Sequence, residues 1–105
     1  MGQYGPRRRS IEYKLAMRTV IEDEAVSNVI DREQALYPRL TEAFDALKWW
    51  LSHNPESGEL LDDLNWIYKQ KGDRNQTVPA LVVIYTFDAR YVTLKYVLVR
   101  IPSIG

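Results

Sequence analysis

Four cationic side chains in the last third of the sequence are the residues best suited to chemistry. Lys69, Lys71 and Arg74 lie close together, and Arg100 follows near the C-terminus. Ammonium and guanidinium groups gathered in this way bind phosphate oxygens and can hold a nucleic-acid backbone. Alternatively, they belong to a solvated strand edge, where lysine discourages pairing with a second sheet.

The arginines at 7–9 and the tryptophans add further contact residues. Such an arginine run is most often a flexible, solubilising tail, and the alternative is a contact with nucleic acid or the ribosome. Trp50 flanks an apolar helical stripe, so we expect it in the core, whereas Trp49 is expected to be exposed at a partner interface.

Several classes of site are excluded by composition. With no Cys and one His, the chain has no disulfide framework, no thiolate zinc site and no histidine cluster. The one imidazole, His53, falls at an expected helix C-terminus, where it interacts favourably with the helix dipole. No phosphate loop, dinucleotide fingerprint or nucleophile elbow is present. We therefore expect neither a metal nor a cofactor.

The formal net charge is zero, from 14 Lys and Arg against 14 Asp and Glu, but the charges are unevenly placed. Residues 1–18 carry a net +4, residues 19–64 carry −8, and residues 65–105 carry +4. Such asymmetry bears on partners rather than on fold. We expect a positive sheet surface built from the two terminal segments, with the acidic segment on the opposite face.

The length of 105 residues and the 46% hydrophobic content fit one globular domain, placed at 11–105 after a flexible basic tail at 1–10. Apolar runs are far shorter than the roughly 20 residues of a membrane helix, so no membrane contact is expected. No apolar stretch follows the N-terminal arginines, so we expect no secretory signal and a cytoplasmic location.

Strands must position these cations, and the strand pattern is clearest in the last third of the sequence. Residues 81–87 and 91–101 are β-branched and aromatic, which predicts two strands joined by a hairpin at 88–90. Residues 66–71 predict a strand that carries the two lysines, and period-two alternation over residues 11–18 predicts an opening strand.

The middle of the chain is expected to form two helices. Apolar residues between 20 and 30 have helical spacing, and a second apolar stripe runs through Leu40, Phe44, Leu47 and Leu51. The second helix begins either at a capping box of Asp31 and Gln34, which would leave Pro38 inside it, or nearer to Pro38.

The expected fold class is therefore α+β, in the order β-α-α-β-β-β: a small four-stranded antiparallel sheet, mixed at its edge, with a helical hairpin on one face. On the last strand, alternation places four apolar side chains on one face: Val92, Leu94, Tyr96 and Leu98.

This order resembles the RelE/ParE toxin superfamily of bacterial toxin–antitoxin modules. The resemblance covers roughly residues 11–101. It is carried by the opening strand at 11–18, the helix end Leu-Lys-Trp-Trp-Leu-Ser-His-Asn-Pro at 47–55, the basic strand Trp-Ile-Tyr-Lys-Gln-Lys at 66–71, and a final hairpin of Val-Val-Ile-Tyr at 82–85 and Val-Leu-Val-Arg at 97–100.

The resemblance implies a toxin held by an antitoxin protein, acting either on ribosome-bound messenger RNA or on DNA gyrase. In the nuclease members, basic sheet residues stabilise charge at the scissile phosphate without a metal. The matching catalytic positions here are Lys69, Lys71 and Arg100, with Arg74 as a further nucleic-acid contact.

Two departures from the nuclease pattern keep a second hypothesis open. Pro-Ala-Leu at 79–81 stands where nuclease members carry an arginine, and the chain ends in Pro-Ser-Ile-Gly without their C-terminal tyrosine or histidine. The first hypothesis is a toxin that cleaves messenger RNA. The alternative is a non-catalytic binding module, either a gyrase inhibitor or a degenerate toxin that holds an antitoxin peptide.

Overall fold

The computed structural model describes residues 17–73 and 78–100. The expected basic tail, most of the expected opening strand at 11–18, and Arg74 lie outside the described residues. The described chain forms two α-helices, a short 3-10 helix and five strands: β1 (Thr19–Glu22), α2 (Glu24–Glu33), α3 (Leu40–His53), η1 (Pro55–Ser57), β2 (Glu59–Leu60), β3 (Trp66–Gln70), β4 (Ala80–Phe87) and β5 (Tyr91–Arg100).

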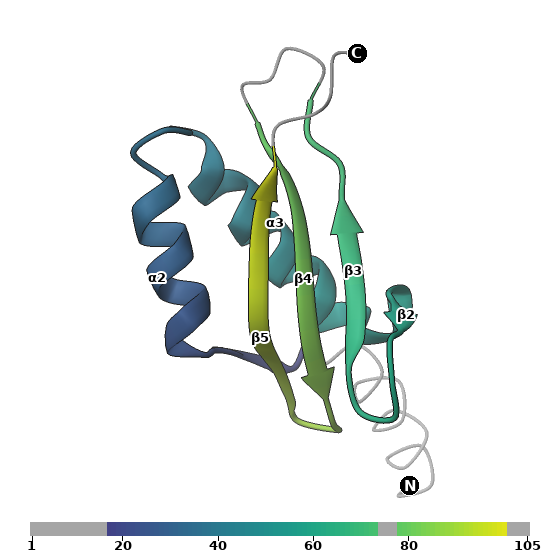
Figure 1. Cartoon of the computed structure of the whole chain (residues 1–105). Coiled ribbons are helices and arrows are strands. Elements are labelled where there is room, and N and C mark those ends of the chain that lie inside the picture. The colour runs from purple at the N-terminus through teal and green to yellow at the C-terminus, as the bar shows by residue number, and fades with distance from the viewer. Residues whose placement is uncertain (1–16, 74–77, 101–105) are drawn as a thin grey trace, which may run out of the picture.

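One mixed sheet holds all five strands in the spatial order β1-β5-β4-β3-β2. Figure 1 labels β5, β4, β3 and β2 in this order. The strands β2 to β5 form antiparallel pairs, and β1 lies parallel to β5 at one edge. The α+β class is confirmed, but the expected four-stranded sheet and the order β-α-α-β-β-β are wrong. The additional strand β2 has two residues, too few for an alternation signal, and exists through its pairing with β3.

The N-terminal half departs most from the expectation. Val20 and Ile21, expected at the start of a helix, lie in β1, while Met17 and Arg18 form no strand. The pairing of Val20 with Val92 and of Ile21 with Thr93 decides the outcome, because short apolar runs fit both periodicities until a partner strand is known.

The structure also settles where the second helix begins. Helix α3 begins at Leu40, so Pro38 lies in the preceding turn. Asp31 and Gln34 do not form the expected capping box, because Asp31 lies inside α2 and Gln34 is its C-terminal cap. The alternative with a start near Pro38 is therefore the correct one.

A bulge in β5 reverses the expected faces of its second half. Tyr85 pairs with Leu94 and Ile84 pairs with Tyr96, so Lys95 is an additional residue in β5. An additional residue moves every later side chain to the other side of the sheet. Val97 is therefore buried beside Val92 and Leu94, and the expected single face of Val92, Leu94, Tyr96 and Leu98 is wrong.

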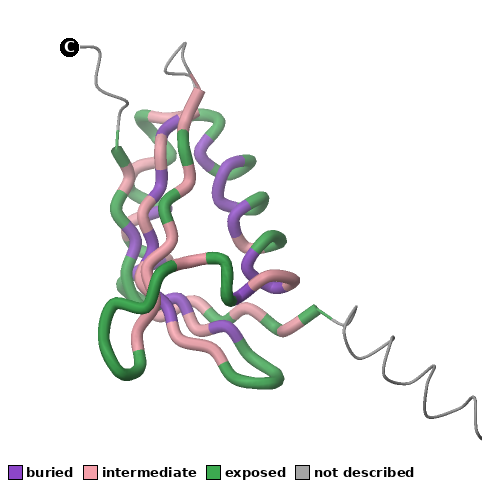
Figure 2. The backbone as a smooth tube through the Cα atoms, turned by 90° about the vertical axis from the view of Figure 1, so that its right-hand side faces the viewer, coloured by how far each residue is buried: buried purple, intermediate pink, exposed green. Residues whose placement is uncertain are grey.

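Both helices pack on one side of the sheet and form the core with it (Figures 1 and 2). Tyr85 is fully buried at the centre of β4, where its hydroxyl donates to the Pro55 carbonyl oxygen at 2.6 Å and accepts from the Gly58 N–H at 3.2 Å. Burial raises the pKa of Tyr85 to about 12. This hydroxyl fixes the segment after α3 to the sheet.

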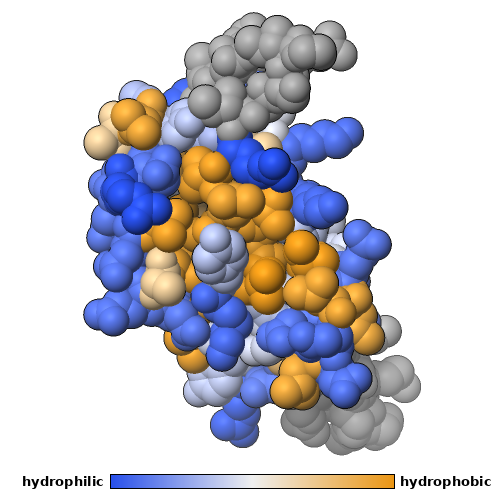
Figure 3. Space-filling model, viewed as in Figure 1, coloured by the Kyte–Doolittle hydropathy of each residue, from blue (hydrophilic) through white to orange (hydrophobic). Residues whose placement is uncertain are grey.

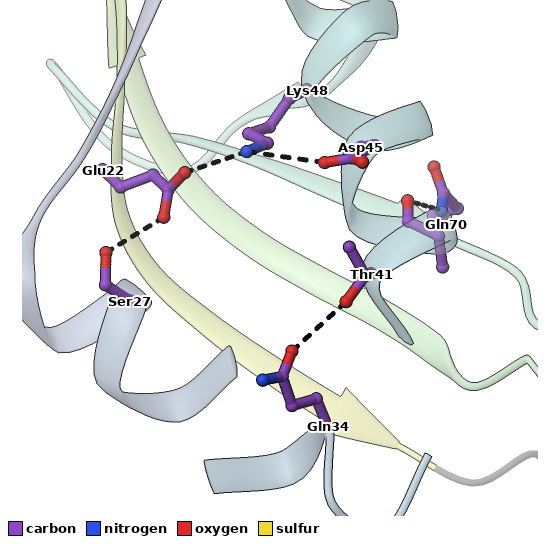
Figure 4. Close-up of polar contacts among 8 residues, drawn as sticks. Glu22, Ser27, Gln34, Thr41, Asp45, Lys48 and Gln70 are labelled. Carbon is purple, nitrogen blue, oxygen red and sulfur yellow. Dashed lines mark hydrogen bonds and ion pairs between the residues drawn. The ribbon is translucent and has the colours of Figure 1, made fainter. Parts of the chain in front are cut away.

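Half-buried polar contacts join β1 to the helices (Figure 4). Glu22 accepts from Ser27 Oγ at 3.0 Å and from Lys48 Nζ at 2.9 Å, and Asp45 lies 3.7 Å from the same ammonium group. On the other side of α3, Gln70 Nε2 donates to the Ala43 carbonyl oxygen at 2.9 Å. The helical layer is thereby anchored to β1 and to β3.

Candidate binding surface

The side of the sheet that faces away from the helices has no covering layer among the described residues. The strand register shows which residues lie on this side, because paired residues share a side and successive residues along a strand point to opposite sides. We call this side the open face. It carries Ile21 from β1, Ile67 and Lys69 from β3, Val82, Ile84 and Thr86 from β4, and Tyr91, Thr93, Tyr96, Leu98 and Arg100 from β5.

The centre of the open face is apolar (Figure 3). Tyr96 and Leu98 are 49% and 40% exposed, and Val82 and Ile84 beside them on β4 are half-buried. Ile21 is 42% exposed and extends the apolar area toward β1. Single exposed apolar side chains are ordinary, but a continuous patch of them marks an interaction site.

The sequence-predicted cations Lys69 and Arg100 lie at one end of the open face. Lys69 pairs with Val82, which pairs with Leu98, so Lys69 lies two strands from β5. Adjacent strands are about 4.8 Å apart, which places the backbones of β3 and β5 about 10 Å apart. Lys71, exposed just beyond β3, lies at the same end. We call these three residues the basic end.

The predicted positive sheet surface is therefore only partly present. In the described chain the cations occupy one end of the open face and aliphatic side chains occupy its centre. Lys95, a further cation of β5, lies 3.9 Å from the Asp23 carboxylate. The N-terminal arginines, which would have contributed positive charge, fall outside the described residues.

Carboxylates gather at the other end of the sheet, in the two turns that face away from the basic end. Asp88 lies between β4 and β5, and Asp62 and Asp63 lie between β2 and β3. Hydrogen bonds from the N–H groups of Arg90 and Tyr91 lower the pKa of Asp88, and those from Asn65 and Leu64 lower the pKa of Asp62. We call these three aspartates the acidic end. The Arg18 side chain donates to the Asp88 carbonyl oxygen at this end. The positive charges of Arg18 and Arg90 also lower the pKa of Asp88, so they offset part of the charge of the acidic end.

Trp49 lies on α3 in the helical layer, on the opposite side of the sheet from the basic end. It is 58% exposed, as expected for a partner contact, and its ring is 4.3 Å from the His53 ring. Trp50 is 39% exposed and donates to Ser57 Oγ at 2.9 Å, so its expected place in the core is wrong. The stripe buried from α3 runs instead through Leu40, Phe44, Leu47 and Leu51.

Two clefts flank the end of α3. One of about 560 Å³ lies between β1 and α3 beside Trp49, and one of about 490 Å³ is lined by Arg18, Trp50 and His53. In the first, Lys48 is already held by Glu22 and Asp45. In the second, His53 Nδ1 lies 2.8 Å from the Trp49 carbonyl oxygen. This contact at the C-terminal end of α3 is enough to explain the position of the imidazole. Neither cleft joins the basic residues that the sequence singles out.

The apolar centre of the open face is the feature that sequence reasoning missed. The bulge at Lys95 turns Tyr96 and Leu98 outward, and the only signal for it is the break in alternation along residues 95–99.

Within residues 17–73 and 78–100, no three His, Cys, Asp or Glu side chains form a group that could hold a metal ion. No helix of that part of the chain is long and apolar enough to cross a membrane. Comparisons of the chain with protein-family models, curated proteins and solved structures find no match.

Proposed function

We propose that the protein is a toxin-like component of a toxin–antitoxin module that acts as a binding module and holds a partner chain on its open face. The observation that carries this proposal is the chemistry of that face, with an aliphatic centre and cations at one end. Apolar area supplies binding free energy, and the cations supply orientation. The basic strand and the final hairpin, which resemble those of the RelE/ParE superfamily, give the biological setting.

The partner's chemistry follows from the same surface. An antitoxin segment would place apolar side chains over Val82, Ile84 and Leu98 and carboxylates beside Lys69 and Arg100. Aliphatic neighbours surround these two cations on the sheet, and aliphatic side chains cannot transfer protons. Holding a partner is therefore better supported than cleaving a substrate.

The experiment uses the product of the adjacent reading frame, which a toxin–antitoxin module requires. We expect it to co-purify with the wild-type chain, and we expect Leu98→Lys to weaken the complex at least about tenfold, as loss of a central apolar contact does. Leu36→Lys is the matched control, because Leu36 is 70% exposed in the turn between α2 and α3. Equal affinity of the Leu98→Lys and Leu36→Lys variants would refute the proposal.

Cleavage of messenger RNA on the ribosome is the second candidate, favoured by the shared position of Lys69, Lys71 and Arg100 at one end of one face. Three convergent cations can hold consecutive phosphates and stabilise negative charge. Replacing all three with alanine should abolish growth inhibition on expression, while Lys95→Ala should leave it intact. Translating ribosomes incubated with the purified protein should yield defined cut sites, and uncut messenger RNA would exclude this candidate.

A further inference from the structure

The open face carries cations at one end and an apolar patch at its centre, and the turns just beyond its other end carry carboxylates. Lys69, Lys71 and Arg100 form the basic end, and the turns that hold Asp62, Asp63 and Asp88 form the acidic end. A surface with this arrangement is complementary to itself when one copy is turned end over end. We propose that two copies of this chain pack open face to open face, with the basic end of each copy against the acidic end of the other.

The size of the patch fits such an interface. The eight residues of β4 span about 26 Å, and three adjacent strands span about 15 Å, so the apolar patch on these strands covers at most about 400 Å². Patches of this size lie in the range of the largest that monomeric proteins expose, and patches in that range are often functional. Two sheets pack face to face about 10 Å apart through interleaved side chains, and Leu98, Tyr96 and Ile84 are suited to that layer.

Charge determines the relative direction of the two copies. A two-fold axis perpendicular to the strands places Arg100 of one copy over the turn that contains Asp88 of the other, and the reverse contact forms by symmetry. A parallel arrangement would place both basic ends together and is disfavoured by repulsion. The zero net charge of the chain adds no long-range repulsion between copies.

The interface is small for a stable dimer. A standard stable interface buries about 800 Å² on each partner, roughly twice the apolar patch, so the charged ends must contribute the rest. We therefore expect a dissociation constant in the micromolar range. The inference goes beyond the proposed function because the occupant is a second copy of the chain. It predicts that a partner chain and self-association compete for one face.

Sedimentation velocity of the full chain tests the dimer. Between about 0.1 and about 100 μM, which brackets a micromolar constant, the wild-type mass should rise from near 12.3 kDa toward twice that value. Leu98→Lys should weaken association at least about tenfold, and Leu36→Lys should associate like the wild type. Circular dichroism of each variant is the control that it is folded. Leu98 is 40% exposed on the uncovered side, so its replacement leaves the core intact.

Charge reversal tests the orientation. The same axis places Lys69 of one copy over the turn that contains Asp63 of the other. Lys69→Glu should therefore weaken association about twofold to fivefold, and adding Asp63→Lys should restore most of the loss because complementarity returns. A wild-type mass of 12.3 kDa across the range overturns the proposal. Equal association of the Leu98→Lys variant and the wild type, or no effect of Lys69→Glu, also overturns it. None of these outcomes depends on binding the adjacent-frame product, so the two proposals can fail separately.

Discussion

Replacing Tyr85 with Phe removes a single hydroxyl at the junction between α3 and the sheet. That hydroxyl donates to the carbonyl oxygen of Pro55, which is itself buried, at 2.6 Å and accepts from the Gly58 N–H at 3.2 Å. The ring remains, so the variant creates almost no cavity. The change therefore isolates the two hydrogen bonds.

The expected loss of stability is about 2 kcal/mol. Leaving a buried acceptor without a donor costs about 1–3 kcal/mol, and the longer bond from Gly58 adds little. For a domain of this size, a loss of 1 kcal/mol lowers Tm by about 4–8 °C, so Tm should fall by about 10 °C.

The same hydroxyl gives stability a distinct dependence on alkaline pH. Burial raises the pKa of Tyr85 to about 12, above its usual value of about 10 in an unfolded chain. Between these values the unfolded state releases a proton that the folded state retains, so stability falls as pH rises through this window. The loss approaches roughly 3 kcal/mol at pH 12, and it should be absent from Tyr85→Phe.

Urea unfolding of both proteins between pH 8 and pH 12 measures both effects. We expect the stability difference of about 2 kcal/mol at pH 8 to shrink steadily above pH 10. Tyr96→Phe is the control, because its side chain is 49% exposed and the change should stay within about 0.5 kcal/mol. A difference below about 0.5 kcal/mol for Tyr85→Phe, or one that does not change with pH, would contradict the buried hydroxyl.

Further predictions concern the turns and the polar contacts. Gly58→Ala should destabilise the fold by about 1–3 kcal/mol in thermal unfolding, since a Cβ there would lie 2.5 Å from the Ile67 carbonyl oxygen. Lys48→Met should lower stability by about 1 kcal/mol, and a double-mutant cycle with Glu22→Gln should show that the two side chains are coupled. Asp88→Ala should destabilise at neutral pH, and because hydrogen bonding lowers the pKa of Asp88, its difference from the wild type should shrink as pH falls below about 4.

The elements predicted well from sequence are those whose signal is local. The stripe of Leu40, Phe44, Leu47 and Leu51 matches the buried side of α3, because helical spacing is contained within the segment itself. The hairpin of β4 and β5 follows from β-branched runs and a short polar turn, with bounds within a residue of the prediction.

The elements that were missed depend on contacts distant in sequence. Val20 and Ile21 become a strand because β5, some seventy residues later, pairs with them in parallel. β2 exists only through its pairing with β3, and the bulge at Lys95 only through its register against β4. These long-range pairings also determine which side chains cover the open face, so local patterns found the cations but not the apolar centre.

The most direct test of the open face as the working surface is a methyl NMR spectrum of the labelled chain. The spectrum is recorded with and without the product of the adjacent reading frame. We predict that the methyl signals of Val82, Ile84 and Leu98 shift on addition, while those of Leu36 on the helical side keep their positions. Shifts confined to Leu36 and its neighbours, with the three sheet signals unchanged, would contradict the central claim.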